Sequence, residues 1–254
     1  MKKALLWEEM TREALNAVAP QALAVLPVGA VEQHGPHLPV GTDSFTVEYL
    51  ARAASDEASR SIPIVLAPTL RFGSSHHHIP FGGTLSLSTE TYYRVLCELG
   101  ESFILAGFKR LFVLNGHGGN NELIQLAARD LALKHSVSIA AAAYWTIAWD
   151  DLVAEKAHEH GLLPGHAGIF ETSQMMALRP ELVEESRPHR DSVEKSDPRS
   201  FFDAYRVETH GAWQAINGYS DSPDQARSQL GKTWLAAGVR SIARAFLEFH
   251  AGTV

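Results

Sequence analysis

The stretch ALAVLPVGAVEQHGPHLPVGTD, residues 22–43, changes character in its middle. Residues 22–29 are almost all apolar and predict a buried strand. The residues that follow include four ionisable side chains, Glu32, His34, His37 and Asp43. Glycines and prolines are interspersed among them, so the segment is predicted to be a loop. Ionisable side chains in a loop directly after a core strand indicate a functional site at the end of that strand.

The rest of the chain alternates between strand-like and helix-like patterns. Further strands are predicted at 62–70, 110–116 and 136–145, and helices at 44–60, 88–108, 120–135 and 221–249. Asp43 or Ser44 is expected to cap the first of these helices and Ser88 the second. Strands that alternate with helices predict an α/β fold with a mostly parallel sheet covered on both faces. Residues 187–200 are predicted to form an exposed loop, and residues 1–254 are expected to form one domain.

Composition excludes several classes of protein. The chain has 254 residues, 45% of them hydrophobic and 20% charged, which are ordinary values for a globular protein. A net charge of -7 without a basic cluster argues against nucleic acid as a partner. No run approaches the roughly 20 apolar residues of a membrane span, and Glu8 and Glu9 interrupt any signal-peptide pattern. A cytoplasmic protein that does not bind membranes is expected.

Polar segments follow the predicted strands at their carboxyl ends. They are EQHGPHLPVGTD (32–43), GSSHHHIPFGGT (73–84), NGHGGN (115–120) and, after a further helical stretch, GHAGIFETS (165–173). Ligands of open parallel sheets bind at the carboxyl ends of the strands. These four segments, far apart in the sequence, are therefore expected to converge on one crevice.

The residue types in these segments are those that bind divalent metal ions. Glu32 and His34 are two residues apart, so an extended segment places them on one side. Asp43 offers a carboxylate that could bridge two ions, and His117 and Glu171 offer further ligands. Oxygen and nitrogen donors without a usable thiolate suit Zn²⁺, Mn²⁺ or Fe²⁺. Taken singly, a histidine after a strand is more often an ordinary loop residue than a metal ligand, and NGHGGN could be a tight turn or an anion nest.

With these motifs the sequence resembles the creatininase (creatinine amidohydrolase) family. The matching pieces are LPVGAVEQHGPHLPVGTD, GSSHHHIPFGGTLSLS, LFVLNGHGGNN, HAGIFETSQMMALRPELV and NGYSDSPDQARSQLGK, in family order from about residue 25 to residue 235. The resemblance implies a three-layer α/β/α fold and a two-metal hydrolase acting on the C–N bond of an amide. It also implies a homo-oligomer, often a hexamer.

The resemblance assigns roles residue by residue. Glu32 and His34 would each hold one metal ion, Asp43 would bridge the pair, and His117 would be a further ligand. His166 would transfer a proton, and Glu171 would be the fifth ligand or a catalytic neighbour of it. The candidate substrate-binding residues are His78, Gly118 and Trp145.

Two departures from the family pattern bear on the substrate. True creatininases resemble GHYEN at the third motif, with a tyrosine that touches substrate and a glutamate that binds metal, where this chain has Gly118 and Gly119. Many relatives also carry an acidic residue at the position of Ile169. The first difference turns the prediction away from creatinine and towards Glu171 as the fifth ligand, and the second suggests a missing helper carboxylate.

The predicted function is a two-metal amidohydrolase that cleaves a C–N bond of a small cyclic amide by a metal-activated water. Within enzymes, the alternatives are a formamide hydrolase and a metallopeptidase that trims peptides. From another class, the alternative is a catalytically inactive protein that binds a metal or ligand.

Overall fold

A computed structural model describes residues 3–191 and 209–253 of the chain. The strands are β1 (Leu5–Leu6), β2 (Leu23–Val28), β3 (Ile64–Leu66), β4 (Arg110–Asn115) and β5 (Ser138–Ala143). The helices are α1 (Arg12–Val18), α2 (Thr42–Ala58), α3 (Thr89–Leu105), α4 (Asn121–Lys134), α5 (Tyr144–Ile147), α6 (Trp149–Ala154), α7 (Ile169–Leu178), α8 (Ala212–Ala215) and α9 (Ser228–Gly252).

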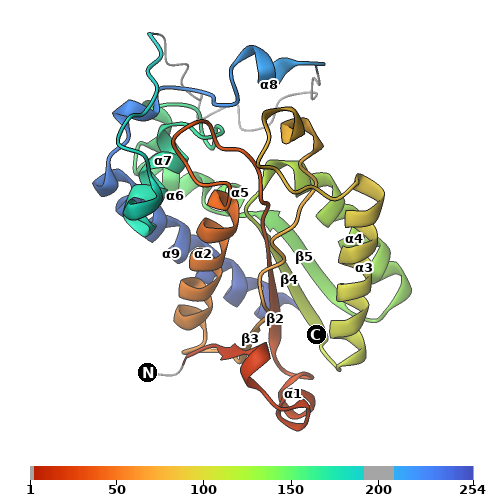
Figure 1. The fold of residues 1–254 in the computed structure, drawn as a ribbon. Helices are drawn as coiled ribbons and strands as arrows, with labels where there is room; N and C mark the ends of the chain where they lie inside the picture. Colours follow the sequence, from red (N-terminus) through yellow and green to blue (C-terminus); the bar gives the residue numbers. More distant parts are fainter. Residues whose placement is uncertain (1–2, 192–208, 254) are drawn as a thin grey trace.

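The strands form one sheet in the order β1-β3-β2-β4-β5, and every neighbouring pair is parallel. Helices cover both faces, with α2 and α9 on one side of the sheet and α3 and α4 on the other (Figure 1). The predicted three-layer α/β/α fold is therefore confirmed. The polar segments that follow β2 and β4 begin at the same edge of the sheet.

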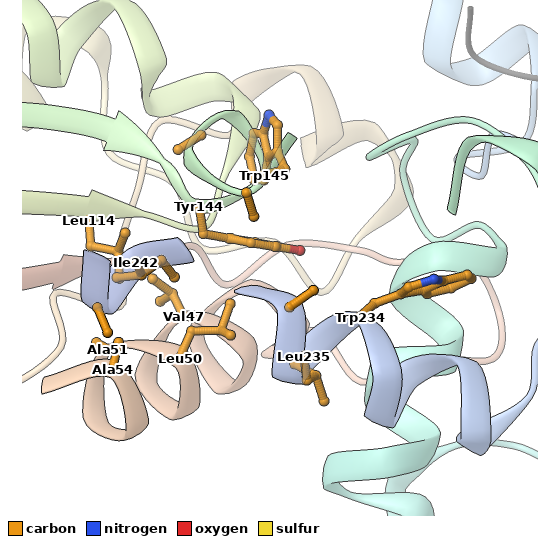
Figure 2. Close-up of a cluster of buried hydrophobic side chains, with 14 of the residues drawn as sticks. Val47, Leu50, Ala51, Ala54, Leu114, Tyr144, Trp145, Trp234, Leu235 and Ile242 are labelled. Atoms are coloured by element: carbon orange, nitrogen blue, oxygen red, sulfur yellow. The ribbon is translucent and has the colours of Figure 1, made fainter. Parts of the chain in front are cut away.

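The central strand β2 separates two hydrophobic cores because successive side chains of a strand point to opposite faces. Leu23 and Val25 face the core under α2 and α9, whereas Ala24 and Leu26 face the core under α3 and α4. All six residues of β2 are buried, as a parallel strand covered on both sides requires. Figure 2 shows part of the first core, where side chains of α2 and α9 meet those that follow β5.

Several of the predicted elements need correction. The second predicted strand, 62–70, shortens to Ile64–Leu66, with only a single further bridge between Val28 and Leu70. The last predicted helix, 221–249, begins at Ser228, because residues 221–227 form a loop and a short 3-10 turn. Strand β1 and helix α1 were not predicted, since their apolar runs are short. The predicted loop at 187–200 falls mostly outside the described residues.

One further expectation concerns membranes. Within residues 3–191 and 209–253, none of the helices combines the length and the hydropathy that crossing a bilayer demands.

The packing of α7 on α9 gives a prediction about stability. A Cβ atom added at Gly231 of α9 would lie 1.8 Å from the backbone oxygen of Ser173 in α7. A larger residue at position 231 would therefore force the two helices apart. We expect Gly231→Ala to lower the free energy of unfolding by about 2 kcal/mol. The melting temperature, measured by calorimetry at fixed protein concentration, should fall by about 4–8 °C.

The matched control is Gly252→Ala, at the other end of the same helix, where an added Cβ would meet no atom within 4 Å in the described part of the chain. Its melting temperature should stay within about 2 °C of the wild type, since the substitution changes only helix propensity. Equal melting temperatures for the two variants would contradict the close packing of α7 on α9.

Candidate metal centre

The ends of β2 and β4 lie against the first turn of α2, and two glycines permit this contact. An added Cβ at Gly29 would lie 2.8 Å from Ser44 Oγ, and one at Gly116 would lie 2.9 Å from the backbone oxygen of Asp43. Because neither position has a side chain, both strand ends can reach the residues that begin α2. The loops after the two strands therefore meet next to Asp43.

The loop after β2 folds back on itself before α2 begins. The backbone N–H of Glu32 donates to the oxygen of Val40 at 2.9 Å, and Gly35 takes a positive φ of 64° in the turn between them. Helix α2 starts at Thr42 with Gly41 as its N-cap residue. The prediction that Asp43 or Ser44 caps this helix is therefore wrong, because both lie inside its first turn. The side chain of Asp43 is directed to the histidines instead.

The carboxylate of Asp43 lies between two histidine rings. Its Oδ1 is 3.1 Å from Nε2 of His34, and its Oδ2 is 3.1 Å from Nδ1 of His117. On the first side, Glu171 Oε2 lies 3.6 Å from the same nitrogen of His34. On the second side, Glu32 Oε1 lies 3.3 Å from the same nitrogen of His117. The five predicted metal ligands thus form two groups that share Asp43.

Each of these two rings is held from behind by a backbone carbonyl. Nδ1 of His34 lies 3.1 Å from the oxygen of Glu32, and Nε2 of His117 lies 3.1 Å from the oxygen of Ser74. A carbonyl oxygen only accepts, so these ring nitrogens carry the proton and donate it. The opposite nitrogen of each ring is left to face the carboxylates. Histidine ligands of metal ions are usually oriented in this way.

The site attracts positive charge. Burial on its own would lower the pKa of His34, but Asp43, Glu171 and Glu32 together raise it to about 10. The pKa of His117 is likewise raised, against the effect of burial, by Glu32 and Asp43. Burial raises the pKa of Glu171, and the neighbouring Asp43 adds to this effect. Three buried carboxylates this close together therefore require cations near them.

The residues present fit divalent metal ions. Among the described residues, the side chains that line the cavity above the site include no lysine, arginine or cysteine. Glu32 Oε2 and Asp43 Oδ2 are buried without a hydrogen-bond partner in the described part of the chain. His34, Asp43 and Glu171 have ligand atoms within 4.8 Å of one another, and so do Glu32, His77 and His117. Buried carboxylates whose neighbours are histidines, and not lysine or arginine, suit a bound divalent cation, which can take the place of the ring protons.

A cavity of about 1030 Å³ opens over the two ligand groups. His78, Gly118 and Trp145, the three predicted substrate-binding residues, all line it, as does the predicted proton-transfer residue His166. The far wall comes from residues 209–216, where Trp213 packs edge-on against His78 with ring centroids 4.8 Å apart. The structure thus brings the predicted site residues to one cavity, except His34, which is buried behind the cavity wall against Asp43. The roles of these residues stay predictions.

Comparisons with known proteins agree with this geometry. The profile of the family described as "Creatininase: Creatinine amidohydrolase" matches residues 8–246. The chain belongs to the creatininase family. Creatinine amidohydrolase of Pseudomonas putida is 29% identical to it and is covered over 98% of both chains. A solved structure described as "Creatininase Mn" has a TM-score of 0.79 at 27% identity, covering 97% of this chain and 99% of its own.

Other similar proteins carry different names. The mycofactocin precursor peptide peptidase of Mycobacterium tuberculosis (strain CDC 1551 / Oshkosh) is 33% identical over 64% of this chain and 61% of its own length. A 3-dehydro-scyllo-inosose hydrolase of Thermotoga maritima is 30% identical over 74% of this chain and 59% of its own length. These relatives are named as an amidohydrolase, a peptidase and a hydrolase, which confirms the prediction of a metal-dependent hydrolase.

The structure shows the surroundings of Gly119 and Ile169, two positions at which the sequence departs from the creatininase pattern. A side chain at Gly119 would collide with His117 Nε2 and the oxygen of Ser74, at 2.5 and 2.3 Å from the added Cβ, so the backbone here leaves no room for a glutamate. Glu171 approaches His34 from α7 and supplies a carboxylate to that group. Ile169 is buried in the core beneath α9 and does not line the cavity, so it does not mark a missing helper carboxylate.

Two residues near the site were not found from the sequence. Gln33 lies between Glu32 and His34 but points to the other side of the segment, where it contacts His78 and His166. Its place between two predicted ligands, with period-2 alternation, was the signal that could have revealed it. Trp213 had no such signal, because it reaches the cavity from a segment almost 100 residues after His117.

His37 supports the site from behind and does not line the cavity. Its Nε2 lies 2.9 Å from the hydroxyl of Thr172 in α7, so the ring ties the loop after β2 to the helix that carries Glu171. Burial lowers the pKa of His37 to about 4, and the positive charges of His34 and Arg187 contribute. His37 therefore acts as a structural residue that joins two elements of the site.

The lowered pKa of His37 predicts a pH-dependent contribution to stability. As the pH falls below about 6.5, His37 takes up a proton in the unfolded chain but not yet in the folded chain. This uptake favours the unfolded state, so the unfolding free energy is highest above pH 6.5 and decreases towards pH 4. Between pH 7 and pH 5 we expect the wild type to lose about 1–2 kcal/mol more unfolding free energy than His37→Gln.

Urea unfolding of the metal-free protein at both pH values measures this difference. The control is His76→Gln, at an exposed histidine, and this variant should follow the wild type. If His37→Gln loses as much stability as the wild type, the histidine is not held neutral by the fold.

Proposed function

We propose that this member of the creatininase family is a two-metal amidohydrolase that cleaves the C–N bond of a small, ring-shaped amide. The observation that carries the proposal is the position of Asp43, with one carboxylate oxygen 3.1 Å from His34 and the other 3.1 Å from His117. A carboxylate in that position can bridge two ions. His34 and Glu171 would complete one ligand set, and Glu32 and His117 the other.

When bound, a pair of divalent ions generates a nucleophile from water at neutral pH and polarises the amide carbonyl. Solved structures of relatives described as "Creatininase Mn" and as "Zn-Zn type" support manganese or zinc in this role. The protein fixes the ligands through the carbonyls behind His34 and His117. It also surrounds them with buried groups, so the charged atoms face one another and not bulk water.

His166 is placed to move the proton that amide cleavage requires. It lines the cavity, and its Nδ1 lies 3.6 Å from Glu32 Oε1, at the edge of the proposed ligand set. Burial, together with the positive charge of His34, holds the pKa of His166 well below its usual value, so the ring is neutral at pH 7. A neutral ring can accept a proton from the attacking water and then return it to the leaving nitrogen.

A peptide is the second candidate substrate, and the size of the cavity favours it. About 1030 Å³ is at the upper end of the range for small-molecule sites and exceeds what a small ring needs. The mycofactocin precursor peptide peptidases among the relatives support the same alternative. The backbone at Gly118 also leaves open space at the cavity wall, since an added Cβ there would meet nothing within 4 Å in the described residues.

Replacement of the bridging carboxylate tests the two-metal proposal. Wild-type protein purified without a tag and loaded with Mn²⁺ or Zn²⁺ should hold about two ions per chain by elemental analysis. Asp43→Ala should hold fewer than one, because both ligand groups lose a shared member. Asp150→Ala, at an exposed aspartate on α6, is the matched control and should hold as many ions as the wild type. Two tightly held ions in Asp43→Ala would refute the bridging role.

A substrate panel separates the candidate reactions. The metal-loaded wild type is assayed for hydrolysis of lactams and cyclic ureas, of N-formyl compounds, and of short peptides. We expect the largest kcat/KM within the cyclic amides, and His166→Asn should lower kcat by about 10²–10⁴-fold with the metal content unchanged. Higher kcat/KM on peptides would replace the ring amide with the second candidate, and a fully active His166→Asn would remove the proton-transfer role.

A further inference from the structure

The side chain of Gln33 is buried behind the candidate metal centre, beside two stacked histidine rings. Its amide nitrogen lies 2.9 Å from His78 Nδ1 and 3.0 Å from His166 Nε2. The two rings stack on each other, with centroids 4.3 Å apart and planes inclined by 15°. Their other nitrogens, His78 Nε2 and His166 Nδ1, both lie 3.6 Å from Glu32 Oε1, on the side of the carboxylates. One amide thus contacts both rings from the side opposite the reaction.

Two backbone groups fix which way this amide points. The N–H of Gly35 lies 2.9 Å from Oε1 of Gln33, and a backbone N–H only donates. The oxygen of Gly218 lies 3.0 Å from Nε2, and a carbonyl only accepts. The oxygen and nitrogen of the Gln33 amide therefore cannot be exchanged without breaking both bonds. Gln33 donates one of its two amide hydrogens to the oxygen of Gly218, so only one hydrogen is left to donate to a histidine ring.

The proton on His166 follows from the backbone of the same residue. Nε2 of His166 lies 3.0 Å from the carbonyl oxygen of Gln33, so this nitrogen carries a hydrogen and donates it. It then cannot accept a hydrogen bond from the Gln33 amide as well. In the neutral ring the lone pair is on Nδ1, the nitrogen nearest the carboxylate of Glu32.

The proton on His78 then has one possible place. The second amide hydrogen of Gln33 is donated to His78 Nδ1, which must be unprotonated to accept it. The hydrogen of a neutral His78 is therefore on Nε2. This atom is buried, makes no hydrogen bond among the described residues and lies 3.6 Å from Glu32 Oε1, on the side of the carboxylates.

We propose that Gln33 is a positioning residue that sets the tautomers of His78 and His166, so that the cavity side of the pair offers one N–H and one lone pair. In its catalytic part this inference rests on the proposed function. There, His166 Nδ1 takes a proton from water as the oxygen–carbon bond forms. It returns that proton to the amide nitrogen as the carbon–nitrogen bond breaks, and the N–H of His78 donates to the carbonyl oxygen of the substrate.

Nitrogen NMR of the imidazoles tests the inference without any substrate. Protein labelled with ¹⁵N-histidine is measured both metal-free and loaded with diamagnetic Zn²⁺, and the variants His78→Asn and His166→Asn assign the signals. In the wild type we expect the proton on Nε2 of both rings. A proton on Nδ1 of either neutral ring would overturn the proposal, and this result does not depend on any variant of Gln33.

Substitution of the amide supplies the second arm. Gln33→Glu places only an acceptor beside His78, so a proton should appear on Nδ1 of that ring. Gln33→Met removes the hydrogen bond without adding a charge and should populate both tautomers of His78. The matched control is Gln229→Glu, the same change at an exposed position of α9, which should leave both rings as in the wild type. Unchanged tautomers in folded Gln33→Glu would overturn the positioning role.

Kinetics separates this inference from the proposed function. On an amide that the wild type hydrolyses, Gln33→Glu should lower kcat about 100-fold, while KM changes less than about threefold and the metal content is unchanged. A purely structural residue would instead change metal content or stability. If the NMR result holds but no amide is hydrolysed by the wild type, the proposed reaction fails and the control of the tautomers by Gln33 stands.

Discussion

The rest of the site depends on three carboxylates, Glu32, Asp43 and Glu171, that are buried together at one edge of the sheet. Such a group is unstable in an apolar interior unless positive charge lies next to it. In the described part of the chain the cavity wall offers histidines and no basic side chain of fixed charge. Backbone carbonyls orient the two nearest rings so that the second nitrogen of each ring faces one side of Asp43. Divalent cations fit this arrangement, since they neutralise the carboxylate oxygens and accept a lone pair from each of the two histidine rings.

The fold explains how these groups meet. Parallel strands all end at one edge, so the loops after β2 and β4 approach each other although more than 80 residues separate them. The missing side chains at Gly29 and Gly116 let both loops press against the first turn of α2, which carries Asp43. Helix α7 then brings Glu171 from a fourth segment, and His37 ties that helix to the loop after β2. The metal centre is thus assembled at the junction of separate elements and not within a single motif.

Much of this could be predicted from the sequence. Strongly periodic elements such as α3 and α4 were placed to within a few residues, and the residue types after the strands indicated metal chemistry at the correct edge. Local capping rules failed at Asp43, because its carboxylate is directed towards two histidines and not towards the helix backbone. The role of Gln33 could not be predicted, since it depends on Gly218, which is 185 residues away. Ile169 was misjudged because spacing from a motif does not show that a side chain points into the core.

The lack of a side chain at Gly119 distinguishes this chain from the creatininase motif pattern, while Glu171, which approaches His34, leaves two ligand groups around Asp43. The most direct test is anomalous diffraction from crystals of the protein loaded with Mn²⁺ or Zn²⁺. Two peaks are predicted, one among His34, Asp43 and Glu171 and the other among Glu32, Asp43 and His117. A single peak, or two peaks that do not share Asp43, would contradict the account.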